Sequence, residues 1–250
     1  MSAWTQCAYS YDGTFAGFLT CVGESFRHRE YPEYFFPPGS GQLCLYPLRE
    51  ISTDHVLAGS VYHALETRVS GAFRRLVTYS FLTCLPLKER QIYYAVHLGL
   101  LRSLPRDRTD DRVLILTRAV RHLTREAEQY RGFVRFSDYG GVLVGQIAPE
   151  NRVLPLLRPH FCRRMPEKAF LLHDRTHREG LFYACHKWKI RPVDRLDLER
   201  PDRADLEFRA LWRRFYETAA VHEHQDPKLR QNKMPGRFRG EMTGSREDPA

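Results

Sequence analysis

The spacing of apolar residues changes at Gly132, and this change divides the chain into a helical part and a β-rich part. Before Gly132, apolar residues recur every three or four positions, as in "RVLILTRAVRHLTREAEQYRG", where Val113 and Leu116 share a face. After it, "FVRFSDYGGVLVGQIAP" alternates with a period of two around a turn at Gly140 and Gly141. The two parts therefore require different kinds of secondary structure.

The first half is predicted to be predominantly helical. "TQCAYSYDG" is typical of a short strand that ends at a turn, and the apolar spacing after it predicts a helix over about 15–26. Prolines and glycines are concentrated in 31–49, which predicts a loop. Capping residues and apolar spacing predict further helices, the first of them capped by Ser52, Thr53 or Asp54, over about 54–70, 73–85, 86–105 and 110–132.

The second half is predicted to contain a small, mostly antiparallel sheet. One hairpin is expected after Gly132, and a second joins "KAFLLHD" to "GLFYACHKW" through "RTHRE". Between them, "VLPLLRPHFCRRM" is predicted to be a short helix that crosses the sheet, and another helix is expected over 203–221. The fold class is therefore α+β, with a helical N-terminal half, this sheet, and a C-terminal helix with a basic tail. We expect a single domain over 1–243, divided into 1–130, 131–191 and 192–243, and a disordered end at 244–250.

The charge of the chain is strongly positive, at a formal +9. Six of the 39 basic residues are lysine and 33 are arginine, and the excess is largest between residues 61 and 191. Guanidinium groups suit bidentate contacts to phosphate, so a polyanionic partner is one interpretation. An arginine-rich proteome would give the same ratio without any ligand. No apolar run is long enough for a membrane span, and the start lacks a signal peptide's basic and apolar regions, so we expect a soluble, cytoplasmic protein.

Basic residues from several segments are the candidate phosphate-binding set. Arg158, Arg163 and Arg164 lie on or beside the short crossing helix, and Arg178 lies in the turn between two strands. Further candidates are Arg131 and Arg135 before this helix, and Lys233, Arg237 and Arg239 around Phe238 in the tail. A solvated basic face is the alternative for the central group. For the tail, the alternative is a segment that packs back on the domain.

A second possibility is acid–base chemistry by a histidine next to a carboxylate. Asp174 could orient the imidazole of His160 or His177 by fixing its tautomer. His160 and Cys162 together with Cys185 and His186 offer zinc-binding atoms, but their spacing is not that of a zinc site, and no metal or other cofactor is predicted. The phosphate-binding loops of nucleotide enzymes and the zinc motif of base deaminases are also missing from the sequence.

Five segments together resemble a known family. They are "YDGTFAGFLT", "GFVRF", "RPHFCRRMP", "HDRTHREGL" and "MPGRFRGEMT", and they span the chain up to about residue 243. The family is the DNA-metabolism protein family that carries domain of unknown function 4130. The resemblance implies a partner of a radical-SAM protein in DNA modification or repair, sometimes fused ahead of a uracil-DNA glycosylase domain. The chain departs from the family in having fewer aromatic residues after "MPGR", which weakens a stacking role for Phe238.

The leading hypothesis is an accessory protein that binds nucleic acid through an arginine-rich cleft and works with a radical-SAM partner. None of the six cysteines lies within ten residues of another, so an iron–sulfur cluster of the radical-SAM type would have to belong to a separate protein. A uracil-DNA glycosylase is a further expected partner. The alternatives are an enzyme that acts on a nucleotide or nucleic acid through His160, Asp174 and His177, and a scaffold for an acidic protein.

Overall fold

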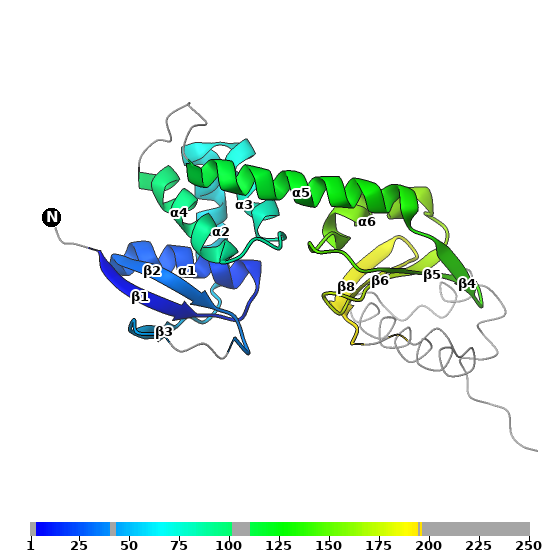
Figure 1. Cartoon of the computed structure of the whole chain (residues 1–250), viewed down its shortest axis with the longest axis horizontal. Helices are drawn as coiled ribbons and strands as arrows, with labels where there is room; N and C mark the ends of the chain where they lie inside the picture. Colours follow the sequence, from blue (N-terminus) through cyan, green and yellow to red (C-terminus); the bar gives the residue numbers. More distant parts are fainter. Residues whose placement is uncertain (1–3, 41–43, 102–110, 195, 197–250) are drawn as a thin grey trace, which may run out of the picture. The chain divides into compact units, whose positions relative to one another are not determined.

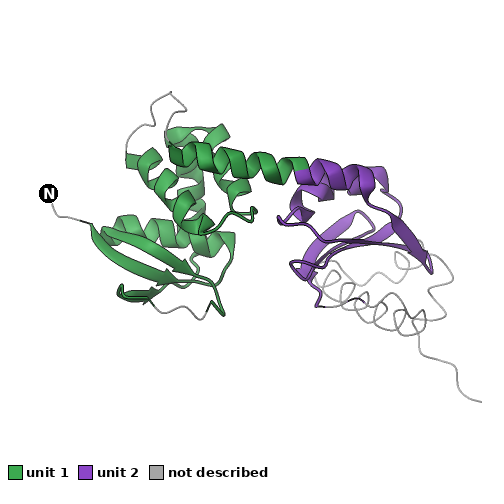
Figure 2. Ribbon diagram, viewed as in Figure 1, with its two compact units in different colours: residues 1–125 green, residues 126–250 purple. Residues whose placement is uncertain are grey.

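The computed structural model describes residues 4–40, 44–101, 111–194 and 196, and these residues form six α-helices and two separate sheets (Figure 1). They belong to two compact units, unit 1 (residues 1–125) and unit 2 (residues 126–250), each described by itself (Figure 2). Among the described helices, none is both long and apolar enough to cross a membrane. The helix predicted over 203–221 and the basic tail lie outside the described residues.

Unit 1 contains a parallel sheet that the sequence only partly indicated. Strand β1 (Thr5–Ser10) pairs with β2 (Glu30–Phe36) and with β3 (Leu48–Glu50), in the order β2-β1-β3. The prediction of a loop over 31–49 was therefore wrong for β2 and β3. Pro32 is the physical reason for this error. It lies within β2, opposite Cys7 of β1, where the register of the two strands shifts. A proline is tolerated at such an irregularity because its missing N–H interrupts little of the ladder.

Helix α1 (Phe15–His28) follows β1 after a turn, as predicted. Thr14 caps the helix, and its hydroxyl oxygen accepts a hydrogen bond from the Gly17 N–H at 2.9 Å. The Asp12 carboxylate accepts hydrogen bonds from the Thr14 N–H at 2.9 Å, from the Thr14 hydroxyl at 2.8 Å and from the Thr53 hydroxyl at 2.7 Å. The turn after β1 is thereby tied to the segment after β3.

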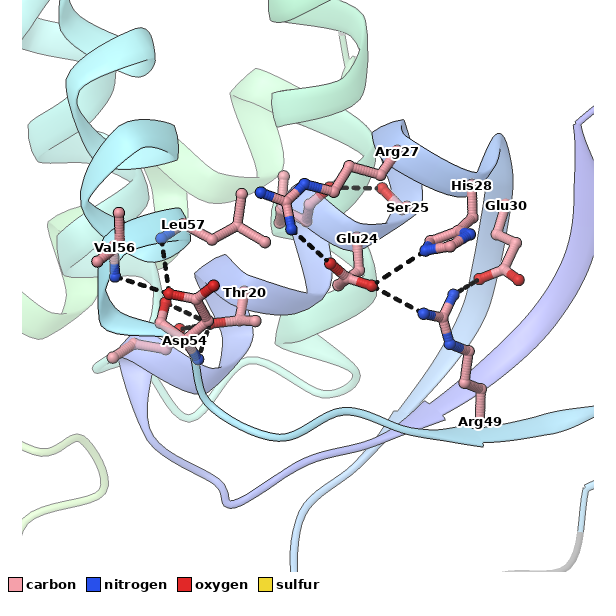
Figure 3. Close-up of polar contacts among 12 residues, drawn as sticks. Thr20, Glu24, Ser25, Arg27, His28, Glu30, Arg49, Asp54, Val56 and Leu57 are labelled. Atoms are coloured by element: carbon pink, nitrogen blue, oxygen red, sulfur yellow. Dashed lines mark hydrogen bonds and ion pairs between the residues drawn. The ribbon is translucent and has the colours of Figure 1, made fainter.

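The other helices lie where apolar spacing and caps predicted them. They are α2 (His55–Ala64), which runs into a π-helical turn η1 (Leu65–Val69), then α3 (Gly71–Ser80), α4 (Lys88–Leu101) and α5 (Asp111–Phe133). Of the three predicted capping residues, Asp54 caps α2, and it does so by accepting from the N–H groups of Val56 and Leu57 (Figure 3). Much of the core of unit 1 is aromatic and aliphatic, and includes Tyr9, Phe18, Val22, Leu65, Ile92, Tyr93 and Val96.

An ion-pair network joins α1 to two strands of this sheet. Glu24 contacts Arg27, His28 and Arg49, and Arg49 also contacts Glu30 at 2.9 Å (Figure 3). Glu30 in turn accepts a hydrogen bond from the buried Tyr9 hydroxyl. The network fixes the short strand β3, which has few apolar contacts of its own.

His97 lies in an aromatic cluster of unit 1 without a hydrogen bond at one ring nitrogen. Its ring is T-shaped against Trp4 with centroids 4.6 Å apart, is stacked on Phe26 at 5.3 Å, and contacts Tyr31 and Tyr93. Its Nε2 is buried and has no hydrogen-bond partner in the described part of the chain. Burial, and then the charge of Arg112, lower the pKa of His97 below its ordinary 6.5.

We expect unit 1 to lose stability as the pH falls below about 6.5. Because the pKa of folded His97 is depressed, the unfolded chain takes up a proton first, so the stabilisation is complete above 6.5 and declines toward the folded pKa. Urea unfolding at pH 7.5 and 5.5 measures this effect. The variant His97→Phe keeps the aromatic packing and cannot titrate, so it should lose less stability over this interval than the wild type. An equal loss in both proteins would assign the effect to other groups.

Unit 2 is built on a five-stranded mixed sheet in the order β4-β5-β6-β7-β8. Its strands are β4 (Phe136–Tyr139), β5 (Val142–Ile147), β6 (Ala169–Asp174), β7 (Glu179–Ala184) and β8 (Lys187–Pro192). The pair β5–β6 is parallel and the other pairs are antiparallel. Helix α6 (Leu154–Arg164) connects the parallel pair, so the predicted crossing helix is confirmed.

Two strand predictions in unit 2 needed correction. Helix α5 continues to Phe133, and the first strand begins only at Phe136. The segment predicted as one strand, "GLFYACHKW", is divided by a turn into β7 and β8. The turn consists of Cys185 and His186, both with positive φ (50° and 60°). Such turns usually carry glycine or asparagine, so Cys185 and His186 do not mark a turn by their residue type.

Candidate nucleic-acid interface

Helix α6 covers one face of the sheet of unit 2 with its apolar side. Leu154, Leu157 and Phe161 are buried, and the Phe161 ring packs 5.3 Å from Phe136 and 6.4 Å from Phe170. The two last residues of the helix, Arg163 and Arg164, are exposed. This pattern anchors the helix through one side and leaves its basic residues at the surface.

Three of the predicted arginines lie around the imidazole of His160. Burial lowers the pKa of His160, and the positive charges of Arg131, Arg164 and Arg163 lower it further, in that order, against a weaker opposing effect of Glu128. The Nε2 atom of His160 is buried and accepts or donates no hydrogen bond in the described part of the chain. Charges from α5 and from α6 therefore act on the same imidazole.

Arg131 has contacts that fix it in place. One of its terminal nitrogens pairs with Glu128, and the other donates to the Leu156 carbonyl at 3.2 Å, which joins the end of α5 to α6. Its charge is therefore partly neutralised. Arg163 donates through Nε to the Pro159 carbonyl at 3.1 Å, so its side chain is also oriented. Among the described residues, neither Arg163 nor Arg164 forms an ion pair with a carboxylate.

Arg158 lies on the other flank of α6. Each residue of an α-helix advances by about 100°, so Arg158 and His160 project in nearly opposite directions, with Arg163 between them. The guanidinium carbon of Arg158 lies 4.1 Å from the ring centroid of Trp188 on β8. This cation–π contact brings together two residues that are thirty positions apart.

The structure places Arg178 away from this group. The loop after α6 leads to the amino end of β6, where the Tyr183 hydroxyl donates to the Pro166 carbonyl. Arg178 follows the opposite end of β6, in the turn to β7, with φ of 54°. A strand of this length spans about 17 Å. Arg178 and the end of α6 therefore lie near opposite ends of β6. Arg135 is exposed in the connection between α5 and β4.

Asp174 and His177 form the predicted carboxylate–imidazole pair. Asp174 is fully buried at the end of β6, and its Oδ2 lies 2.7 Å from Nδ1 of His177. Its Oδ1 accepts hydrogen bonds from the backbone N–H groups of Thr176 at 3.0 Å and His177 at 3.1 Å. The carboxylate thus orients one ring and also holds the turn. His160 makes no hydrogen bond to either residue in the described part of the chain.

Sequence reasoning missed Trp188. The residue is 44% exposed although Arg158 lies over one side of its ring. The alternation of basic and apolar residues in "KWKIRP" is a usable signal for a surface strand, whereas the predicted strand "GLFYACHKW" ends at Trp188. The tail candidates Lys233, Arg237, Phe238 and Arg239 lie outside the described residues.

The fold and these side chains define an α+β protein with a basic helix and an exposed tryptophan on its second sheet. Residues 86–244 match the family described as a domain of unknown function, DUF4130. Because the match covers more than half of the chain, the protein belongs to this family. The matched segment contains every candidate residue discussed above. A comparison with curated proteins found no match.

Proposed function

We propose that this protein binds nucleic acid through the α6 surface, which we define as Arg131, Arg158, Arg163, Arg164 and Trp188. The observation that carries the proposal is that Arg163 and Arg164 are exposed at the end of α6 with no carboxylate partner among the described residues, while Arg131 is held against the same helix by its hydrogen bond to the Leu156 carbonyl. Glu128 partly neutralises Arg131, so most of the unpaired positive charge lies on Arg163 and Arg164. Phosphate groups of a nucleic acid would neutralise that charge.

The arginines are suited to phosphate for a second reason. Two exposed guanidinium groups at the end of α6 have no carboxylate partner in the described residues, so binding would not require breaking an ion pair. Arginine presents two parallel donors to the two oxygens of a phosphate. The predicted phosphate-binding residues Arg135 and Arg178 lie away from the α6 surface. They would contact the nucleic acid only if it extended beyond α6, to the start of β4 or to the turn between β6 and β7.

The biological setting in this proposal comes from the family resemblance. We propose an accessory role in DNA repair or DNA modification in the cytoplasm, beside a radical-SAM protein and in some cases a uracil-DNA glycosylase. The tail residues Lys233, Arg237, Phe238 and Arg239 would add contacts to the same ligand. Co-purification of the radical-SAM partner after nuclease treatment would support a direct protein contact.

Replacing Arg163 and Arg164 by alanine should weaken binding and reduce its salt dependence. If each neutralises one duplex phosphate, the slope of log K against log salt should become less steep by about 1.8, since each phosphate contributes roughly 0.9. Fluorescence anisotropy with a labelled DNA at several salt concentrations measures the slope. We expect the affinity near 0.1 M salt to fall at least tenfold.

The matched control is Arg68→Ala with Arg75→Ala, which removes the same charge from exposed positions of unit 1. It should change the affinity less than threefold. If both double variants weaken binding equally, the effect reflects net charge and the α6 surface is not the site. If micromolar protein gives no salt-sensitive signal with single- or double-stranded DNA, the proposed function is wrong.

A second candidate function is acid–base catalysis on a nucleotide or nucleic acid. The specific observation in its favour is the buried Asp174 carboxylate at 2.7 Å from His177, an arrangement that fixes the tautomer of a general base. The same carboxylate also accepts two backbone hydrogen bonds, as a purely structural residue would. Turnover by the purified protein would favour this candidate over simple binding.

A further inference from the structure

Trp188 lies at the end of a row of aromatic rings on the α6 side of the sheet. Residues directly opposite each other on paired strands point to the same face, and the register pairs Phe170 with Tyr183 and Tyr183 with Trp188. The rings of Phe170 and Tyr183 are stacked, with centroids 5.0 Å apart and planes 26° apart. Phe170 and Tyr183 are buried, whereas Trp188 is 44% exposed. The row therefore ends in an aromatic ring at the surface.

Arg158 lies over this exposed ring. Its guanidinium carbon lies 4.1 Å from the ring centroid, which is close for a cation–π contact. The contact places a positive charge next to the ring. A platform of this kind, a flat aromatic surface with a cation beside it, matches a nucleotide, whose base can stack while its phosphate pairs with the cation.

Strand β8 carries its basic residues on the other face. Lys187 pairs with Ala184 and Lys189 pairs with Phe182, and both partners belong to the apolar cluster on the side of the sheet away from Phe170. The α6 side of β8 thus presents Trp188 and Ile190 rather than lysine. The exposed ring is therefore flanked by apolar rather than basic side chains on its own strand face, and its surface is suited to a flat ligand.

We infer that the α6 surface binds single-stranded nucleic acid and that Trp188 stacks on an unpaired base. This inference rests on the proposed function and specifies its substrate class. In a duplex, the bases are already stacked on their neighbours and paired, so a side chain can reach a base face only after a few kcal/mol of unstacking. A single strand offers its base faces freely. The single-stranded nucleic acid would cross α6 from Trp188 and Arg158, past Arg163, to Arg131. This distance is about one helix diameter, roughly 10–12 Å.

The test compares one labelled single-stranded DNA oligonucleotide with a hairpin duplex of the same sequence by fluorescence anisotropy. We expect the wild type to prefer the single strand at least tenfold. Trp188→Ala should reduce affinity for the single strand about tenfold, leave duplex affinity within twofold and leave the salt slope unchanged, because no phosphate contact is lost. Trp188→Phe should restore most of the affinity, since a phenyl ring still stacks.

Circular dichroism melting of each variant separates lost binding from lost folding, and Trp188→Phe gives a second variant if Trp188→Ala does not fold. Equal binding of both DNAs, insensitive to Trp188, would overturn this inference while the proposed function stands. A parallel loss for both DNAs in Trp188→Ala would overturn it as well, because the ring would then act structurally. Failure of both DNAs to bind wild-type protein would overturn the proposed function itself.

Discussion

Replacing Gly17 by alanine should lower the free energy of unfolding of unit 1 by about 2 kcal/mol. A Cβ atom at this position would overlap the Oδ1 atom of Asp12 and lie 2.9 Å from the Thr53 hydroxyl oxygen. Asp12 cannot simply rotate away, because its carboxylate accepts three hydrogen bonds from Thr14 and Thr53. Each of those bonds contributes about 1 kcal/mol, and the loss of all three outweighs the roughly 1 kcal/mol that alanine gains over glycine in a helix.

The sign of this effect is informative because helix propensity predicts the opposite. Alanine is favoured over glycine inside a helix by about 1 kcal/mol. Gly59 in α2 provides the matched control, since it is exposed and a Cβ atom there would meet nothing within 4 Å. Gly59→Ala should raise the free energy of unfolding by about 0.5–1 kcal/mol.

Urea denaturation followed by circular dichroism measures both variants. A further variant, Gly17→Ala combined with Asp12→Ala, removes the overlapping carboxylate. It should be less destabilised than the sum of the two single variants, as expected for residues in direct contact. Wild-type or higher stability of Gly17→Ala would show that the Asp12 contact does not constrain this position. A similar loss in Gly59→Ala would show that the effect is not local.

The helices could be predicted because their signals are local. The cap at Asp54 and the apolar spacing between Val113 and Leu123 act over one or two turns, and each produced the expected helix. The hairpin at Gly140 and Gly141 was also local, since both residues adopt positive φ in the turn. In contrast, β2 carries Pro32 in a bulged register, and its parallel pairing to β1 across α1 is not visible in either segment alone.

The candidate site shows the same division between local and distant contacts. The pair of Asp174 and His177 could be predicted because the residues are three positions apart in one turn. The contact of Arg158 with Trp188 could not, because it requires α6 to cross the sheet and β8 to begin at a turn of Cys185 and His186 that the sequence does not mark. Arg178 is separated from the end of α6 for a related reason: the helix leads into the amino end of β6, and Arg178 follows the carboxyl end of this strand.

Asp174→Ala should destabilise unit 2 by about 3–4 kcal/mol. The carboxylate is fully buried, and its removal leaves three donors without an acceptor, namely the Thr176 N–H, the His177 N–H and the His177 ring. Each buried donor that loses its partner costs about 1–3 kcal/mol, less where water can reach it, as at the His177 ring. Thermal or urea unfolding measures the loss, and a change below about 1 kcal/mol would contradict the structural role of this turn.

Asp174→Asn separates the structural role from the catalytic candidate. The asparagine amide oxygen can still accept from the two backbone N–H groups, so we expect less than half of the stability loss of Asp174→Ala. It cannot stabilise a protonated imidazole as a carboxylate does, and in a His/Asp pair that catalyses acid–base chemistry this change lowers kcat by orders of magnitude. If the wild type shows no turnover, or the folded Asp174→Asn protein keeps it, Asp174 is assigned to the fold. Loss of a turnover present in the wild type would assign the pair to catalysis, because the fold and the α6 surface remain intact in this variant.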